Sequence, residues 1–114
     1  MKKIYLRGHV FCITSISDLT STVTLEALSY ALPIICLDHC GFSHVINDSC
    51  GVKISVKNYN DAVNDFANII NTLYMQEDYR IKLSKGAILR SEDFSWDKKI
   101  KKINYIYSCL VKKI

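Results

Sequence analysis

The sequence predicts an α/β fold in which a short parallel sheet is flanked by helices, and three observations point to it. Two short apolar runs, "VFCITS" (10–15) and "PIICLD" (33–38), are typical of strands buried on both faces, and "GVKISV" (51–56) alternates like a third strand. Helical patterns separate these runs. Strand, helix, strand, helix, strand is the order of a parallel sheet with crossover helices.

Length and composition limit the kinds of protein this can be. The chain has 114 residues, of which 49% are hydrophobic and 23% are charged, a balance typical of a globular protein with a core. We expect one domain over residues 1–114. Arg7 and His9 interrupt the N-terminal apolar stretch, and no run approaches the ~18 apolar residues of a membrane span, so we expect a cytoplasmic location.

Positive charge is concentrated near the C-terminus. Residues 97–114 carry six lysines against Asp97, a net charge of +5, whereas the whole chain carries +4. A solvated face is the favoured explanation, with an anionic lipid surface or a nucleic acid as the alternative. The five cysteines include no CxxC pair, and we interpret them as reduced thiols packed as small hydrophobes.

Several stretches predict helices. "SDLTSTVTLEAL" (17–28) predicts a helix that continues to about Tyr30 and ends before Pro33, and "GFSHVI" (41–46) predicts a short helical turn. From Asn60 onward the apolar spacing is helical, with a break near residues 76–78. The apolar positions of this stretch are Ala62, Phe66, Ile69, Ile70, Leu73, Tyr79, Leu83 and Ala87.

The C-terminal segment, about residues 95–113, predicts a long amphipathic helix. Its apolar side chains recur at steps of four and three residues, which places them on one helical face. They are Trp96, Ile100, Ile103, Tyr107, Leu110 and Ile114. We interpret this C-terminal stripe as a docking face rather than as part of a cofactor site.

Hydroxyl residues gather where a parallel sheet would bind a ligand. Ligands bind outside the carboxyl ends of parallel strands, and "SDLTST" (17–22) follows the strand predicted at 10–15. The first turn of a helix offers unpaired N–H groups and about half a unit of positive charge, which suits a phosphate. Thr20, Ser21 and Thr22 would add hydroxyl donors to this phosphate site.

Asp18 and Glu26 bracket the predicted phosphate site. They are eight residues apart, so along a helix that rises ~1.5 Å per residue they would stand about 12 Å apart. The paired carboxylates of glycosidases lie about 5 to 9.5 Å apart. The two side chains therefore suit the two ends of a long ligand such as a nucleotide diphospho-sugar. Taken singly, Asp18 is equally well explained as a helix N-cap, and Glu26 as a solvated helical residue.

The stretch "TSISDLTSTVTLEALSYALPIICLDHCG" (14–41) resembles the donor-binding motif of the family-four glycosyltransferases, which have a GT-B fold. That motif runs Ser, two residues, Glu, Gly, one residue, Ser, then Leu-Glu-Ala, a Gly-x-Pro strand entry and a glycine-rich turn. The matching positions here are Ser15, Asp18, Ser21, Leu25, Glu26, Ala27, Pro33 and Gly41. "EDFSWDKKIKKINYIY" (92–107) is similar to the family's closing helix, so the resemblance covers about Tyr5 to Tyr107.

The resemblance implies a role for each candidate site residue. Glu26 would bind the ribose hydroxyls of the nucleotide, and Asp18, the candidate catalytic residue, would lie near the transferred sugar. The other candidates form two groups: the backbone around Thr20, Ser21 and Thr22 would hold the diphosphate, and the turn of Gly41 and Phe42 would approach the sugar.

Three positions depart from the family pattern. Leu19 and Ala31 stand where glycine is usual, and His44 stands where the family commonly has glutamate. Ala31 would end a helix in the left-handed conformation, at a cost of ~1 kcal/mol relative to glycine.

The same resemblance implies that the chain is half of a GT-B fold: a partial Rossmann-like, nucleotide-sugar-binding domain from the C-terminal, donor-binding part of a glycosyltransferase. The donor would be a UDP-sugar or a GDP-sugar, used by a retaining hexosyltransferase without a metal. A glycan or lipid-linked acceptor, in bacterial surface polysaccharide synthesis, would place the protein at the inner face of the membrane. The N-terminal acceptor domain has no counterpart in the chain, so we expect the fragment alone to be inactive.

Other functions stay open on the sequence. The chain could be a non-catalytic remnant or an interaction module with at most weak nucleotide binding. "CLDHCGFSH" (36–44) is rich in possible zinc ligands, but its spacing fits no usual zinc site, so no metal is expected. A Cys–His nucleophile within it is disfavoured because neighbours in sequence need not pair in space. Tyrosines near the lysines are explained by helix packing, so no nucleic acid partner is expected.

Overall fold

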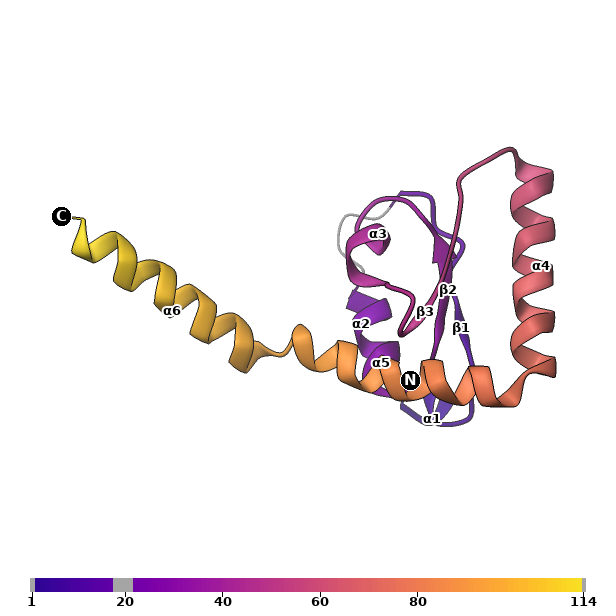
Figure 1. The fold of residues 1–114 in the computed structure, drawn as a ribbon, viewed down its shortest axis with the longest axis horizontal. Helices are drawn as coiled ribbons and strands as arrows, with labels where there is room; N and C mark the ends of the chain where they lie inside the picture. The colour runs from indigo at the N-terminus through magenta and orange to yellow at the C-terminus, as the bar shows by residue number, and fades with distance from the viewer. Residues whose placement is uncertain (1, 18–21, 114) are drawn as a thin grey trace.

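The computed structural model describes residues 2–17 and 22–113. The strands of this part of the chain are β1 (Phe11–Cys12), β2 (Ile34–Leu37) and β3 (Gly51–Ile54). The helices are α1 (Lys2–Tyr5), α2 (Thr22–Ser29), α3 (Phe42–Val45), α4 (Tyr59–Met75), α5 (Glu77–Asp93) and α6 (Trp96–Lys112). The strands pair in parallel in the order β1-β2-β3, which confirms the predicted parallel sheet (Figure 1).

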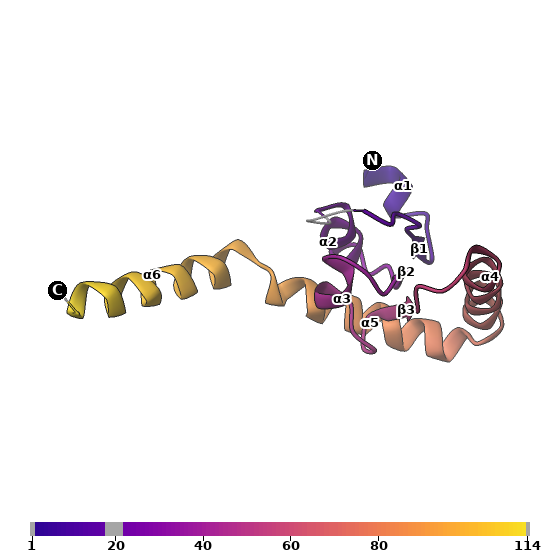
Figure 2. The same cartoon turned by 90° about the horizontal axis from the view of Figure 1, so that it is seen from above.

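Strand β2 lies at the centre of the sheet and is buried on both faces. Ile34 and Cys36 pack with α2 and α3 on one face, whereas Ile35 and Leu37 pack with α4 on the other. This is the burial that the continuous apolar run "PIICLD" predicts. Figure 2 shows the resulting layers from above, with α2 and α3 on one side of the strands and α4 on the other. The α/β prediction is therefore confirmed.

Strand β1 is shorter and more exposed than the sequence predicts. The apolar run at 10–15 predicts a strand buried on both faces, but β1 contains Phe11, which is half-buried, and Cys12, which is exposed. Within the described residues β1 is an edge strand that pairs with β2 alone. The Ile13 N–H still donates to the Ile35 carbonyl at 2.9 Å, so the ladder itself is formed. The edge position accounts for the exposure of this strand.

Helix α2 ends in a left-handed turn at Ala31, as the sequence predicts. Ala31 has a φ of 62°. Its N–H donates to the Leu28 carbonyl at 3.0 Å, and the N–H of Leu32 donates to the Ala27 carbonyl at 3.2 Å. These two bonds form a Schellman motif, and its apolar partners Ala27 and Leu32 are both buried. The motif turns the chain sharply into β2 even though its left-handed position is not a glycine.

Helices α4 and α5 are separated by the break that the sequence predicts, and they make most of the predicted apolar contacts. Gln76 separates them, and the Arg80 guanidinium donates to the Leu73 carbonyl at 2.9 Å near the end of α4. Two predicted apolar positions, Ile70 and Tyr79, are exposed instead of packed. Ile70 follows Ile69 by one position, which rotates it by ~100° out of the packed stripe. The positions that do pack are Ala62, Phe66, Ile69, Leu73, Leu83 and Ala87.

Helix α6 extends away from the rest of the described chain (Figures 1 and 2). Its bounds agree with the predicted C-terminal helix, and the Ser95 side chain caps it by accepting from the Lys98 N–H at 3.3 Å. The stripe residues Trp96 and Ile103 are 75% and 46% exposed. The five stripe residues that the structure describes, Trp96, Ile100, Ile103, Tyr107 and Leu110, are therefore uncovered in the isolated chain. Within residues 2–17 and 22–113, every helix is too short or too polar to cross a membrane.

We expect Ala31→Gly to raise the free energy of unfolding by ~1 kcal/mol, because glycine adopts a positive φ without a Cβ clash. Urea unfolding followed by circular dichroism measures the change. Ala27→Gly, at a buried position inside α2, is the control and should lower the free energy of unfolding by about 1 kcal/mol or more. Destabilisation by both substitutions would contradict this account of the α2 end.

Candidate functional site

The carboxyl ends of the strands form the edge where the sequence places ligand binding. Strand β2 leads through Asp38 into α3, which begins at Phe42. Helix α2 runs back to the start of β2, so its amino-terminal end lies toward the same edge (Figure 1). The topology therefore brings the beginnings of α2 and α3 to one end of the sheet.

Thr22 and Glu26 lie on the exposed surface of α2, one turn apart. The buried Tyr5 hydroxyl donates to a Glu26 carboxylate oxygen at 3.5 Å, which orients this side chain without covering it. Tyr5 itself stacks on Tyr30 with ring centroids 5.1 Å apart. Burial, followed by the nearby Glu26 carboxylate, raises the pKa of Tyr5, so its hydroxyl keeps the proton that it donates. Glu26 is thus an accessible, partly oriented acceptor.

The turn before α3 places Gly41 and Phe42 in different environments. Gly41 is half-buried and has a right-handed φ of −63°, whereas the preceding Cys40 has the positive φ of 54°. The Phe42 ring is buried in the core beside α2 and β2. A ligand at this turn would therefore meet the main chain of Phe42 and not its ring.

Three predicted site residues, Asp18, Thr20 and Ser21, lie outside the described residues. Leu19, one of the departures from the family pattern, lies there too. Their roles stay predictions. The described part of the predicted site consists of Thr22, Glu26 and the Gly41–Phe42 turn.

A charged network beside α3 was not predicted from the sequence. The Ser43 hydroxyl donates to an Asp38 carboxylate oxygen at 2.6 Å, and the Lys53 ammonium donates to the Ser43 carbonyl at 3.1 Å. Lys53 also lies 3.9 Å from the Asp38 carboxylate. The sequence signal was a single charged residue, Lys53, inside the predicted strand "GVKISV". A second contact, from Arg90 to the other end of α3, had no sequence signal.

The stretch "CLDHCGFSH" does not form a metal site among the described residues. Cys36 is buried in the sheet, whereas His39, Cys40 and His44 are exposed. No group of three or more His, Cys, Asp or Glu side chains that could hold a metal occurs within 2–17 and 22–113. Burial raises the pKa of the Cys36 thiol to about 12, so this thiol is neither a ready metal ligand nor a nucleophile.

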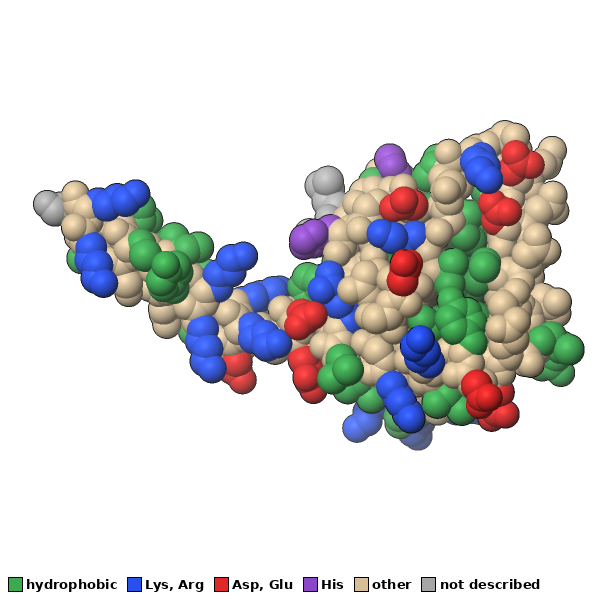
Figure 3. Space-filling model, in the orientation of Figure 1, with side chains coloured by type: hydrophobic (Ala, Val, Ile, Leu, Met, Phe, Trp, Pro, Cys, Tyr) green, Lys and Arg blue, Asp and Glu red, His purple; other side chains and the backbone are tan. Residues whose placement is uncertain are grey.

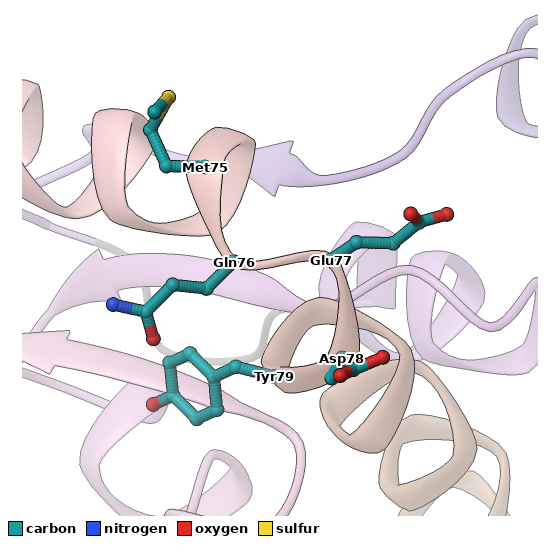
Figure 4. A pocket seen from close by; sticks show the side chains of 5 residues that line it. All are labelled: Met75, Gln76, Glu77, Asp78 and Tyr79. Carbon is teal, nitrogen blue, oxygen red and sulfur yellow. The ribbon is translucent and has the colours of Figure 1, made fainter.

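Two hollows of the surface are lined by residues other than the described site residues. The first, of about 570 Å³, is lined by residues 75–79 at the junction of α4 and α5 (Figure 4). The second, of about 320 Å³, is lined in part by Tyr30, Ala31 and Leu32, which precede β2. It therefore lies toward the amino ends of the strands. Neither of these hollows is lined by Thr22, Glu26, Gly41 or Phe42, although Tyr5, the hydrogen-bond partner of Glu26, lines the second.

Comparison with known proteins gives a family and a fold. The sequence model of the family described as "Glycosyl transferases group 1" matches residues 1–90. Among solved structures, the chain is similar to sucrose-phosphate synthase from Thermosynechococcus elongatus, with a TM-score of 0.78 and 20% sequence identity. The similarity covers 97% of this chain but 27% of that one, so the chain spans about a quarter of the synthase's length. No curated protein matches the chain.

The buried thiol predicts a pH dependence of stability. Burial raises the pKa of the Cys36 thiol to about 12, from 9.0 for an ordinary thiol. At a pH between these two pKa values the folded state binds more protons than the unfolded state. The free energy of unfolding should therefore fall as the pH rises through this range. Cys36→Ala should reduce this slope in alkaline urea titrations, whereas Cys40→Ala, at an exposed position, should leave it unchanged. An identical slope in both variants would refute the assignment to Cys36.

Proposed function

The chain belongs to the family of glycosyl transferases group 1, and from this premise we propose that it is the donor-binding part of a sugar-nucleotide-dependent glycosyltransferase. The observation that carries the proposal is the family match over residues 1–90, which spans every candidate site residue. The α/β sheet with its long C-terminal helix matches half of a GT-B fold. We place the chain in family four on the motif at 14–41.

The exposed start of α2 supports a division of roles along the donor. The chain around Thr20, Ser21 and Thr22 holds the diphosphate at the start of α2, where the helix contributes backbone N–H groups and partial positive charge. Glu26, one turn further along α2, accepts hydrogen bonds from the ribose hydroxyls. The Gly41–Phe42 main chain approaches the sugar, and Asp18 lies near the carbon at which the sugar is transferred.

Catalysis in this proposal is electrostatic. As the glycosidic bond to the phosphate breaks, negative charge develops on the departing nucleoside diphosphate. The N–H groups at the start of α2 stabilise that charge, and because they are fixed by the helix they need little reorganisation. The transfer is retaining and hexosyl-specific, and it proceeds without a metal.

The remaining parts of the proposal concern partners and location. The donor is a UDP-sugar or a GDP-sugar, and the acceptor is a glycan or a lipid-linked glycan of bacterial surface polysaccharide synthesis. The acceptor is held by an N-terminal domain that forms the other wall of the cleft, so this chain alone is inactive. The protein acts in the cytoplasm at the inner face of the membrane. The lysines spread along the α6 arm in Figure 3 suit a nearby anionic lipid surface.

A second function is favoured by a specific observation, the uncovered stripe of α6. All seventeen residues of this helix are described, and none of them is buried. An apolar helical face of this length normally packs against another surface. In this second proposal the chain is an interaction module whose α6 docks on a partner domain, with at most weak nucleotide binding. Nucleotide affinity separates the two functions.

Isothermal titration of the full chain with UDP, GDP, UDP-glucose and GDP-mannose tests the first function. We expect one of the nucleotide series to bind and Glu26→Ala to weaken that binding about tenfold or more, because charge-assisted hydrogen bonds to the ribose are lost. Glu92→Ala is the matched control: it removes an exposed carboxylate from α5, far from the candidate site in sequence, and should bind as the wild type does.

Two results would count against a donor site. Absence of binding by any of the four ligands would leave the interaction module as the better function. Equal affinity of the wild type and Glu26→Ala would leave nucleotide binding possible but would remove Glu26 from the site. Thermal unfolding of both variants verifies that the change is not a loss of fold, since a surface carboxylate should alter stability by less than ~0.5 kcal/mol.

A further inference from the structure

Helix α3 is a single turn that needs support from outside itself. It contains four residues, Phe42 to Val45, and isolated helices of this length are unstable. The carbonyls at the end of any helix also lack partners within that helix. In this chain the Arg90 guanidinium is the partner of two of these carbonyls. Its Nε donates to the Val45 carbonyl at 2.8 Å, and its Nη2 donates to the His44 carbonyl at 2.9 Å. One side chain of α5 thus caps the C-terminal end of α3.

The Arg90 guanidinium is itself held on its other sides. Nη1 donates to an Asp93 carboxylate oxygen at 3.2 Å, and the guanidinium carbon lies 4.7 Å from the centre of the Phe94 ring. The His44 ring meets the same Phe94 ring edge-on, with centroids 6.3 Å apart. Hydrogen bonds from Lys98 and then from Arg90 lower the pKa of Asp93, so this carboxylate stays charged beside the guanidinium. The Arg90 side chain is therefore held in place by its neighbours. We call its two hydrogen bonds to the His44 and Val45 carbonyls the Arg90 clamp.

Close packing of α5 puts Arg90 within reach of α3. Gly86, one turn before Arg90, lies against the Ser49 carbonyl so closely that a Cβ at this position would collide with the backbone. Residues four apart lie on the same face of a helix. The glycine therefore lets α5 approach the segment after α3, and Arg90 then reaches the α3 carbonyls from the same face.

The hydrogen bonds of α3 connect the Arg90 clamp to the Gly41–Phe42 turn. The Val45 N–H donates to the Gly41 carbonyl at 3.1 Å, and the Ile46 N–H donates to the Phe42 carbonyl at 3.0 Å. At the other end, Ser43 is tied to Asp38 and Lys53. The same two peptide groups therefore make both sets of contacts. Their carbonyl oxygens accept from Arg90, and their N–H groups donate to the carbonyls of Gly41 and Phe42.

We propose that Arg90 is a positioning residue for the donor: by holding the carbonyls of His44 and Val45 it fixes the Gly41–Phe42 turn against the sugar of the bound nucleotide. This role rests on the proposed function and adds a residue to it. Arg90 touches neither the nucleotide nor the reacting atoms. Loss of the Arg90 side chain should therefore weaken the binding of a sugar nucleotide and leave the binding of the free nucleotide nearly unchanged.

The test compares Arg90→Gln with Arg80→Gln in the full chain. Arg80 is a close match, because it lies on the same helix, is equally exposed (21% against 20%), donates to a backbone carbonyl and pairs with an acidic neighbour. Affinities for UDP and UDP-glucose, and for GDP and GDP-mannose, are measured by calorimetry. Hydrogen exchange of the Val45 and Ile46 amides is measured by NMR without ligand.

In Arg90→Gln we expect the Val45 and Ile46 amides to exchange about tenfold faster or more, since the turn opens locally. We expect the affinity for the sugar nucleotide to fall about tenfold, with less than about a twofold change for the free nucleotide. Arg90→Lys, which can reach one of the two carbonyls, should recover part of both effects. Arg80→Gln should change neither.

Each contrary result has a separate meaning. Unchanged exchange in Arg90→Gln would overturn the clamp whatever the ligands do. Faster exchange with equal losses for nucleotide and sugar nucleotide would make Arg90 purely structural and overturn the positioning role, while the proposed function would stand. If the wild type binds no nucleotide, the proposed function fails and the role toward the donor falls with it, yet the exchange result still decides whether Arg90 holds α3.

Discussion

The burial of β2 on both faces is the constraint on which the rest of the structure depends. Its side chains alternate between the α2 and α3 layer and the α4 layer, so Ile34 to Leu37 must all be apolar. Its backbone is satisfied by β1 and β3. The strand therefore carries no polar side chain, and the first one, Asp38, comes directly after its end. The carboxyl edge is therefore where side chains are free to meet a ligand.

Local patterns allowed much of this fold to be predicted. A continuous apolar run predicts β2, and the four-and-three spacing predicts α6. The left-handed helix end at Ala31 was implied by the resemblance to a family that usually has glycine at this position. Each of these depends on neighbours in the sequence. The exposure of β1 depends instead on which strands lie beside it, so the apolar run at 10–15 could not predict it.

The candidate site was predictable only in part, for the same reason. The motif around Glu26 is continuous in the sequence, and Glu26 is exposed as a ligand-binding group must be. Its hydrogen-bond partner Tyr5 lies 21 residues away, and Arg90 lies 46 residues from His44. Contacts over such separations arise from the packing of helices on the sheet, and the sequence holds no periodicity that marks them.

Helix α5 also determines how the chain should unfold. Leu83 belongs to the core on the α4 side and Ala87, one turn later, to the core on the α2 side. The two layers cannot separate while α5 remains in place, so they should melt together in one cooperative transition. Helix α6 contributes no buried residue to either core. It is thus a separate stability unit that can fray and re-form while the sheet stays folded, and its order depends on whatever covers it.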